Sequence, residues 1–196
     1  MGIQPIGTLV GMLFTMKYTS TILLFFLSLH IFGQDAEITT TNKFRVNFLN
    51  PAIELDRVTG KKSILTTGIG VGYGGGYPDL TFGGSGFIYI ISPFLDVQQK
   101  WFTNLEKRNQ KGKNTANNSG NFISLRLLVR GESLAENVIR TSNTDFAIGP
   151  TWGIQRSFGE NFHFLFDIGS VYYFDTEGNG NIFPINLQFN IGYNIK

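Results

Sequence analysis

Residues 183–196 alternate strictly between apolar and polar side chains. The apolar positions of this segment are Phe183, Ile185, Leu187, Phe189, Ile191, Tyr193 and Ile195. Successive side chains of a β-strand point to opposite faces, so a period of two predicts a strand with one apolar face and one polar face.

The same alternation recurs from residue 43 onward. In the two preceding segments the apolar face consists of Phe162, Phe164, Phe166, Ile168, Tyr172 and Phe174, and of Phe146, Ile148, Pro150, Trp152, Ile154 and Phe158. Noisier copies occupy residues 65–74, 95–106 and 123–130. Turn-rich pieces separate these segments, at residues 59–62, 74–86, 109–120, 132–143, 157–161 and 175–181. The pattern predicts an all-β domain without an amphipathic helix.

The number of strands follows from a break in the pattern. Residues 44–57 alternate, but the phase slips near Asn50 and Pro51, which predicts a bulge or a tight reversal. Seven strands are clear, and a closed bacterial barrel has an even number. We expect the eighth strand from a split at Asn50–Pro51, or alternatively from a split of residues 86–108 near Ser92–Pro93.

Composition indicates which face points inward. The polar faces carry Asn, Gln, Gly, Ser and Thr rather than Lys and Glu, and only 15% of the chain is charged, against about 25% in an average soluble domain. The apolar faces are rich in Phe, as expected of a band that faces lipid. We therefore predict an antiparallel up-and-down transmembrane β-barrel of about eight strands. A soluble secreted barrel that binds an apolar ligand is the alternative.

An export signal is predicted before the barrel. Lys17 follows Met16, the expected start, and the apolar run TILLFFLSLHIF spans residues 21–32 before Gly33. This run is too short for a membrane-spanning helix, which needs about 20 residues, so we expect a signal peptide cleaved near Gly33. A retained anchor is the other interpretation. We divide the chain into a signal peptide (1–33), a short N-terminal segment (34–42) and a barrel domain (43–196).

Three pieces of the sequence carry a family resemblance. RVNFLNP at residues 45–51 leads into IEL and a short Gly-Lys-Lys turn, WFTNL at 101–105 precedes EKR, and KGKNT at 111–115 runs into NSGNF at 118–122. The chain resembles, over residues 43–196, the small eight-stranded outer-membrane β-barrel domain proteins of Gram-negative bacteria. The resemblance implies an outer-membrane location. It also implies contact with outer-membrane lipids, and with periplasmic chaperones and the barrel-assembly machinery during biogenesis. It implies no reaction, cofactor or oligomeric state.

No motif in the chain predicts catalysis or metal binding. The glycines between Gly68 and Gly76 lack the GK[ST] ending of a phosphate-binding loop, so we interpret them as strand glycines on the lumen face. His163 and Asp167 share a strand face and could both enter the lumen, but no motif places a nucleophile such as Ser157 or Ser170. We therefore expect His163 to be solvated or interfacial. A barrel hydrolase that uses His163 stays the enzymatic alternative.

Charged residues predict a filled lumen. The inward faces carry Lys100, Arg126, Arg130 and Lys196 against Asp96, Glu106, Asp145 and Asp167, which should pair because each buried ion is costly alone. Outside them, Lys107, Arg108, Lys111 and Lys113 form a basic stretch that we interpret as a solvated turn, with anionic lipid or nucleic acid as alternatives. A net charge of only +2 argues against nucleic acid. The predicted function is a non-enzymatic outer-membrane barrel with a plugged lumen and a structural or loop-binding role.

Overall fold

The computed structural model describes residues 39–76, 88–137, 140 and 142–195 of the chain. The predicted signal peptide, residues 1–33, lies outside this part, as does Lys196. The strands are β1 (Lys43–Asn47), β2 (Ala52–Gly60), β3 (Ser63–Gly76), β4 (Ile88–Phe102), β5 (Asn121–Arg130), β6 (Ala135–Glu136), β7 (Asp145–Phe158), β8 (Phe162–Asp175) and β9 (Gly180–Ile195). Two short helices, α2 (Leu105–Gln110) and the 3-10 helix η2 (Ala116–Asn118), follow β4. Within the described ranges the structure contains no helix with the length and apolarity needed to cross a bilayer.

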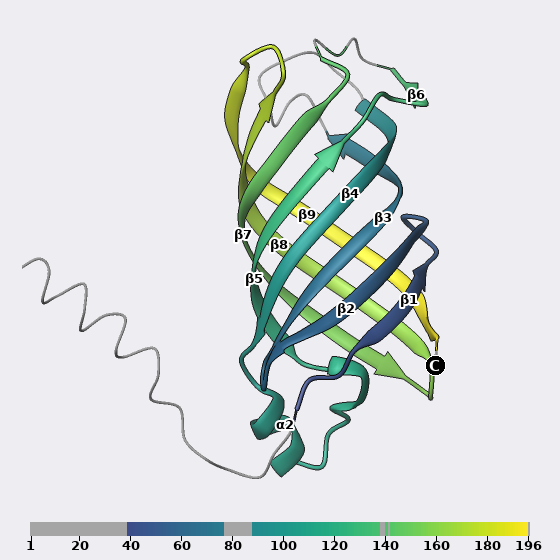
Figure 1. Cartoon of the computed structure of the whole chain (residues 1–196), viewed down its shortest axis with the longest axis vertical. Coiled ribbons are helices and arrows are strands. Elements are labelled where there is room, and N and C mark those ends of the chain that lie inside the picture. Colours follow the sequence, from purple (N-terminus) through teal and green to yellow (C-terminus); the bar gives the residue numbers. More distant parts are fainter. Residues whose placement is uncertain (1–38, 77–87, 138–139, 141, 196) are drawn as a thin grey trace, which may run out of the picture. The chain divides into compact units, whose positions relative to one another are not determined.

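Eight of the strands form a closed antiparallel ring (Figure 1). Each strand pairs with the next along the chain, except that β5 pairs with β7 and the two-residue β6 adds onto β4. The ring closes where β1 pairs with β9, with Phe44 opposite Ile195 and Val46 opposite Tyr193. The predicted all-β, up-and-down architecture is confirmed.

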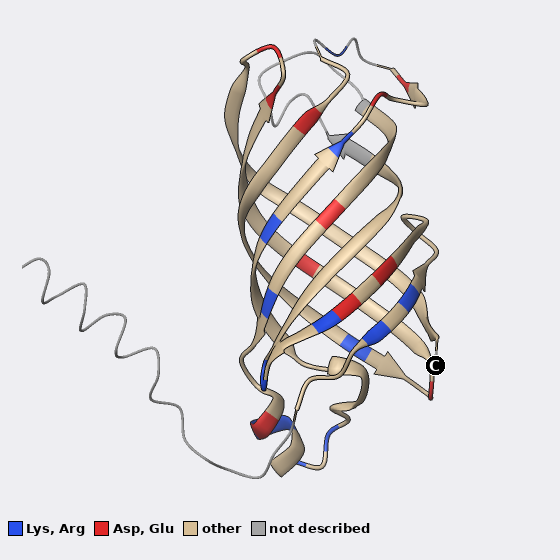
Figure 2. Ribbon diagram, in the orientation of Figure 1, with Lys and Arg blue, Asp and Glu red and all other residues tan. Residues whose placement is uncertain are grey.

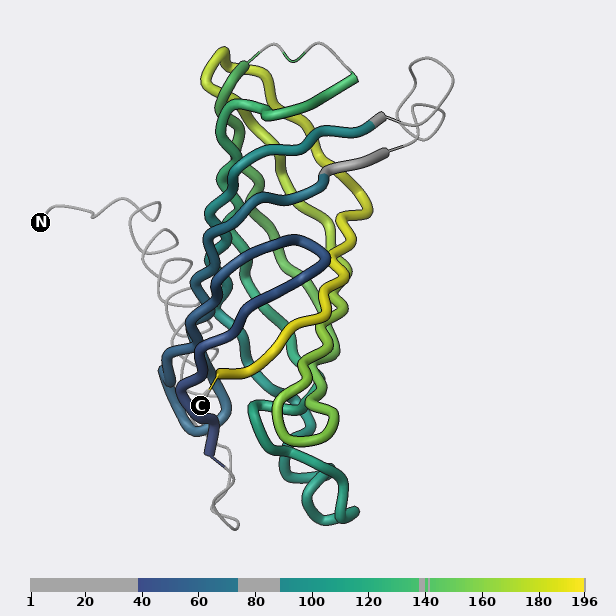
Figure 3. The backbone as a smooth tube through the Cα atoms, turned by 90° about the vertical axis from the view of Figure 1, so that its right-hand side faces the viewer, coloured from purple at the N-terminus to yellow at the C-terminus, as the bar shows by residue number. Residues whose placement is uncertain are grey.

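The eighth strand arises at the predicted reversal. Residues 48–51 turn the chain between β1 and β2, whereas β4 runs without interruption through Ser92 and Pro93. The β1–β2 hairpin is shorter than its neighbours (Figure 3). Its tip bridges the strands on either side, because Asn50 accepts a hydrogen bond from the Tyr73 N–H at 3.0 Å and donates to the Phe189 carbonyl at 3.3 Å.

One irregularity interrupts the predicted alternation of β9. Gly169 of β8 pairs with Asn186, but Val171 pairs with Phe183, so β9 carries an extra residue in this stretch. Pro184 lies there, where its missing N–H costs no ladder hydrogen bond. The alternation of β9 changes phase at this bulge and is uninterrupted only from Ile185 onward.

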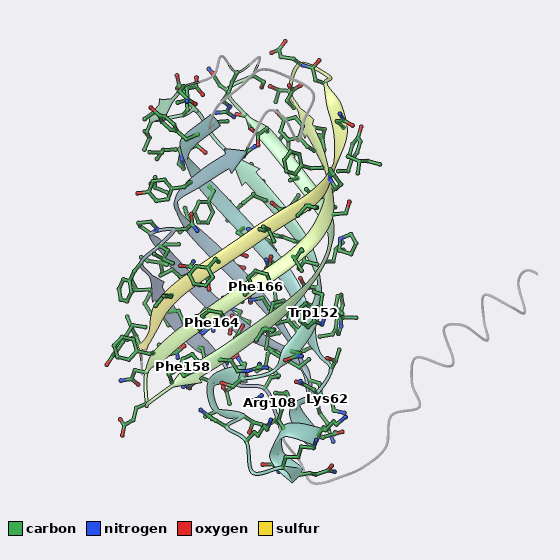
Figure 4. The ribbon with its side chains drawn as sticks, turned by 180° about the vertical axis from the view of Figure 1, so that it is seen from behind. Lys62, Arg108, Trp152, Phe158, Phe164 and Phe166 are labelled. Carbon is green, nitrogen blue, oxygen red and sulfur yellow. The ribbon has the colours of Figure 1, made fainter. Side chains whose placement is uncertain are left out.

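The outer face of the ring is apolar and the inner face is polar, the reverse of the arrangement in a water-soluble barrel. Large apolar side chains point outward from every strand of the ring, and Figure 4 shows Trp152, Phe164 and Phe166 on this outer surface. Leu187 is 60% exposed, whereas Arg45 and Asp56 are 0% exposed in the lumen. The predicted assignment of apolar residues to the outside and polar residues to the inside is confirmed.

The end of the barrel that carries α2 holds the one apolar cluster found among the described residues. It comprises Ile64, Phe102, Leu105, Phe122 and Leu165, all at most 3% exposed. Leu105 corrects the prediction, which placed it on the outer face of a strand through residues 95–106. The strand ends at Phe102, and Leu105 instead begins α2, a helix that the alternation did not predict, and packs inward.

Candidate functional site in the barrel lumen

The middle of the lumen contains a closed cycle of polar contacts. Arg126 donates to both carboxylate oxygens of Asp96, at 2.9 and 2.7 Å, and its Nη1 lies 3.7 Å from Asp167 Oδ1. Gln98 Nε2 donates to Asp167 Oδ2 at 3.1 Å and to Gln188 Oε1 at 3.2 Å. Gln188 Nε2 closes the cycle on Asp96 Oδ2 at 3.5 Å. Because β4 and β9 lie on opposite sides of the ring, this cycle ties the two walls together across the lumen.

A second network lies closer to α2. Arg45 Nη1 donates to Asp56 Oδ2 at 2.7 Å, and Arg45 Nε donates to Glu54 Oε2 at 3.2 Å. Thr66 donates to Asp56 Oδ1 at 2.8 Å and Asn118 donates to Asp56 Oδ2 at 3.2 Å. Every oxygen of the Asp56 carboxylate therefore has a donor, which is what a buried carboxylate requires.

Lys100 lies between these networks and the apolar cluster. Its ammonium donates to Gln155 Oε1 at 3.4 Å and lies 5.0 Å from the centroid of the Phe122 ring, within the range of a cation–π contact. Gly153 leaves room for that ring, since a Cβ at this position would overlap it.

The opposite rim carries a third group of charges. Arg130 donates to both oxygens of Asp145, at 2.7 and 3.1 Å, and Arg140 donates to Asp145 Oδ2 at 2.8 Å. Figure 2 shows both signs of charge distributed around the ring, although single strands can carry one sign: β1 and β5 have only basic residues, and β8 has aspartates but no Lys or Arg.

Of the eight charged residues predicted to point into the lumen, six are placed correctly, one is wrong, and Lys196 lies outside the described residues. Lys100, Arg126, Arg130, Asp96, Asp145 and Asp167 all point inward and have partners or close neighbours of opposite charge. Glu106 does not enter the lumen, because it lies on α2 and pairs with Lys62 at the surface.

The prediction also missed four charged residues of these networks, namely Arg45, Glu54, Asp56 and Arg140. The alternation of Glu54 and Asp56 with Ile53 and Leu55 was a usable signal for two of them. The phase slip at Asn50 obscured that signal.

The segment between β4 and β5 lies across the α2 end of the lumen (Figure 3). Asn117 and Asn118 adopt positive φ angles of 52° and 60°, a conformation that asparagine tolerates better than most residues. Asn118 exchanges two hydrogen bonds with the backbone of Thr41, at 2.8 and 2.9 Å, while its amide also reaches Asp56. Ser119 Oγ accepts from the Ser157 N–H at 2.8 Å. The segment is therefore bonded to the barrel wall and to lumen charges.

His163 lies inside the lumen, so the expectation of a solvated or interfacial side chain is wrong. It is 1% exposed, and neither ring nitrogen has a hydrogen-bond partner among the described residues. Ser157 pairs with His163 across β7 and β8, but its hydroxyl accepts from Asn194 at 3.5 Å. Asp167 also enters the lumen and contacts Gln98 and Arg126. Among the described residues, no hydrogen bond joins His163 to a serine or a carboxylate, so these residues do not form a catalytic relay.

The glycine-rich segment belongs to strand β3. Gly68, Gly70 and Gly72 lie within β3 on the side that faces the lumen, which confirms their interpretation as strand glycines. In the part of the chain that the structure describes, no three side chains of the His, Asp or Glu type are grouped as metal ligands would be.

The predicted basic stretch forms one wall of a surface pocket. Lys107, Arg108, Lys111 and Lys113 line it together with Arg156, from the outer face of β7. The prediction missed Arg156, although it interrupts an otherwise apolar face. This pocket lies outside the barrel wall and is separate from the lumen networks.

Comparison of the chain with known protein families, curated proteins and solved structures found no match.

Proposed function

We propose that the chain is an exported, non-enzymatic β-barrel of the outer membrane of a Gram-negative cell. Its lumen is plugged, and its role is structural in the envelope or lies in binding through its loops. One observation carries the proposal: the outside of the ring is apolar while the inside holds buried ions. Exposed residues such as Ile69 at 64%, Tyr73 at 63% and Leu187 at 60% point to an apolar medium around the barrel.

The closed ring fits this medium. In hydrocarbon every backbone N–H and C=O must find a partner within the protein, at several kcal/mol for each failure. A ring in which β1 pairs with β9 provides such partners around the circumference. The biogenesis partners are then the periplasmic chaperones and the assembly machinery that insert such barrels.

The lumen contents support a closed barrel rather than a channel. Eight strands enclose an interior that side chains just fill. Here the cycle of Asp96, Arg126, Asp167, Gln98 and Gln188 crosses it, and the β4–β5 segment lies across one end. An ion that passes through would have to break these contacts.

The same contents weigh against both alternatives. A soluble carrier of an apolar ligand needs an apolar interior, whereas this lumen contains Arg45, Lys100 and Arg126. A hydrolase needs its histidine held by an acid and aimed at a nucleophile. His163 has neither contact among the described residues.

The first test is localisation and folding. The protein should fractionate with the outer membrane, and its gel mobility should change on boiling, as a closed barrel unfolds. N-terminal sequencing of the membrane form should begin near Gln34 or Asp35. Recovery of the protein in the soluble fraction without detergent would refute the membrane proposal.

A second test addresses the plug. The purified barrel in a planar bilayer should show little or no steady conductance. A large, stable open channel in the unmodified protein would replace the plugged barrel with a porin-like role.

A further inference from the structure

A basic pocket opens on the outer surface of the barrel at the α2 end. It has a volume of about 330 Å³ and is lined by Lys107, Arg108, Lys111, Lys113, Asn121 and Arg156, among others. These residues come from α2, from the segment after it, and from the outer faces of β5 and β7. Segments far apart in the sequence thus bring five positive charges to one hollow.

Among the described residues, no carboxylate forms an ion pair with any of the five cations of this pocket. Two of them are held in place by neutral partners. Arg108 donates to the Asn114 carbonyl at 2.7 Å, and Arg156 donates to the Gln155 carbonyl at 2.7 Å and to Asn121 Oδ1. Two fixed guanidinium groups beside three flexible lysines suit a phosphate, which accepts several charge-assisted hydrogen bonds.

An apolar groove lies on the same outer surface, farther from the strand ends. It has a volume of about 520 Å³ and is lined by Trp101, Ile123, Leu125, Pro150 and Trp152. Ile123 pairs directly with Trp101 on one side and with Trp152 on the other, so the two indoles flank it.

The groove and the pocket are neighbours along the same strands. Asn121 of the pocket and Ile123 of the groove are two residues apart on β5, which is about 7 Å. Figure 4 shows Arg108 of α2 with Trp152 above it on the same side of the barrel. Tryptophan prefers the boundary between hydrocarbon and headgroups. A barrel placed in this way has its apolar groove in the hydrocarbon and its basic pocket in the headgroup layer.

We infer that this composite surface binds one anionic phospholipid, with the phosphate headgroup in the basic pocket and an acyl chain in the groove. The inference rests on the proposed membrane insertion. Two connections at the α2 end, residues 61–62 and 159–161, are the shortest of the ring, and short turns face the periplasm in outer-membrane barrels. The third, residues 103–120, is the longest of the ring, but it is bonded to the barrel wall through Asn118 and Ser119. We therefore place the pocket in the inner leaflet, so its occupant is a phospholipid. Basic pockets at such depths are known to favour anionic headgroups.

The test uses the purified full-length barrel in zwitterionic micelles, titrated with phosphatidylglycerol or phosphatidylcholine and followed by native mass spectrometry. The barrel should retain one phosphatidylglycerol, with an affinity at least about tenfold above that for phosphatidylcholine, or about 1.4 kcal/mol. The variant K107Q/K111Q/K113Q should lose at least about tenfold of that affinity. Among the described residues, the side chains of these lysines make no hydrogen bond or ion pair, so folding should persist.

A matched control removes three cations from the same end but outside the pocket. The variant K43Q/R57Q/K61Q should change the affinity by less than about twofold, because distant charges act only through a screened field. Equal losses in both triple variants would overturn the built site in favour of diffuse attraction. R156K should bind better than R156Q, since it keeps the charge.

Two further measurements distinguish a lipid phosphate from a free phosphate ion as the ligand of the basic pocket. W101A/W152A should weaken phosphatidylglycerol binding, and inorganic phosphate should not displace the lipid. Displacement by inorganic phosphate, with no effect of the tryptophan variant, would overturn the lipid in favour of a free anion. Tighter binding of lipid A would overturn the inner-leaflet assignment.

Insertion into phosphatidylcholine vesicles, measured by gel mobility on the same samples, separates the two proposals. Insertion without any preference for phosphatidylglycerol would refute the lipid site alone, and failure to insert would refute both.

Discussion

Leu187 and Gln188 are neighbours on β9, yet the two side chains occupy opposite environments. Leu187 is 60% exposed on the outside of the ring, and Gln188 is 9% exposed and hydrogen-bonded across the lumen. The same contrast separates Ile123 from Ser124 and Leu127 from Arg126 on β5. In a water-soluble barrel the two environments would be exchanged. The comparison teaches that the medium of each face, rather than the strand propensity of each residue, decides which substitutions the fold tolerates.

The inner face should respond most strongly to loss of a charge. Arg45→Met leaves Asp56 and Glu54 without their cation, and breaking a buried ion pair costs about 3 to 5 kcal/mol of unfolding free energy. Urea unfolding of the barrel in phosphatidylcholine vesicles would measure it. The control Arg57→Met, at an exposed position of β2, should stay within about 0.5 kcal/mol of the unmodified protein.

A compensating variant makes the same prediction sharper. Adding Glu54→Gln and Asp56→Asn to Arg45→Met should restore part of the lost stability, because the buried negative charges are then gone. If Arg45→Met and Arg57→Met lowered the free energy of unfolding equally, the lumen would be as well hydrated as the exterior.

The outer face should respond most strongly to gain of a charge. Leu187→Arg should cost about 2 to 4 kcal/mol if this position lies near the bilayer midplane, whereas Phe158→Arg, at the end of β7, should cost about 0 to 1 kcal/mol. The measurement is again urea unfolding in vesicles. A neutral or stabilising Leu187→Arg would indicate that water surrounds the barrel.

The contrast between the faces was predictable from the sequence because alternation is a local property. The residue order within each strand shows which side chains share a face. The reversal at Asn50–Pro51 was visible as a phase slip in the apolar–polar alternation. The beginning of α2 was not predictable in this way, since Leu105 continues the apolar parity of β4 by coincidence. The bulge at Pro184 was missed for a related reason, because a bulge is set by the pairing with β8.

The partners within the lumen were harder to predict than its contents. Which inward residue meets which depends on the tilt and stagger of the closed ring, and these are properties of the whole sheet. The sequence therefore predicted that Arg126 and Asp96 lie inside the lumen. It could not predict the hydrogen bond from Gln98 to Gln188, which joins residues 90 positions apart. The pocket that unites Arg156 with the α2 segment is non-local for the same reason.

An intermediate effect is expected where the β4–β5 segment is bonded to the lumen. Asn118→Gly removes the bonds to Thr41 and Asp56 while keeping a residue that accepts a positive φ, so it should cost about 1 to 3 kcal/mol. Hydrogen exchange should show faster exchange of the Thr41 amide. Asn117→Gly is the matched control. Asn117 also has a positive φ, and its substitution removes only an exposed hydrogen bond to the Glu160 carbonyl, so its effect should be near zero.

The smallest effect is expected for an ion pair outside the ring. Lys62 and Glu106 pair at the surface with side chains 38% and 35% exposed, whereas Arg126 and Asp96 pair in the lumen at 7% each. A double-mutant cycle should give the exposed pair a coupling of about 0.2 to 1 kcal/mol, reduced further in about 1 M salt. Water solvates each partner of the exposed pair once the other is removed, and the lumen offers no such replacement. The Arg126–Asp96 cycle should therefore give a larger coupling that salt barely changes, and equal couplings with equal salt dependence would contradict the distinction between the two sides of the wall.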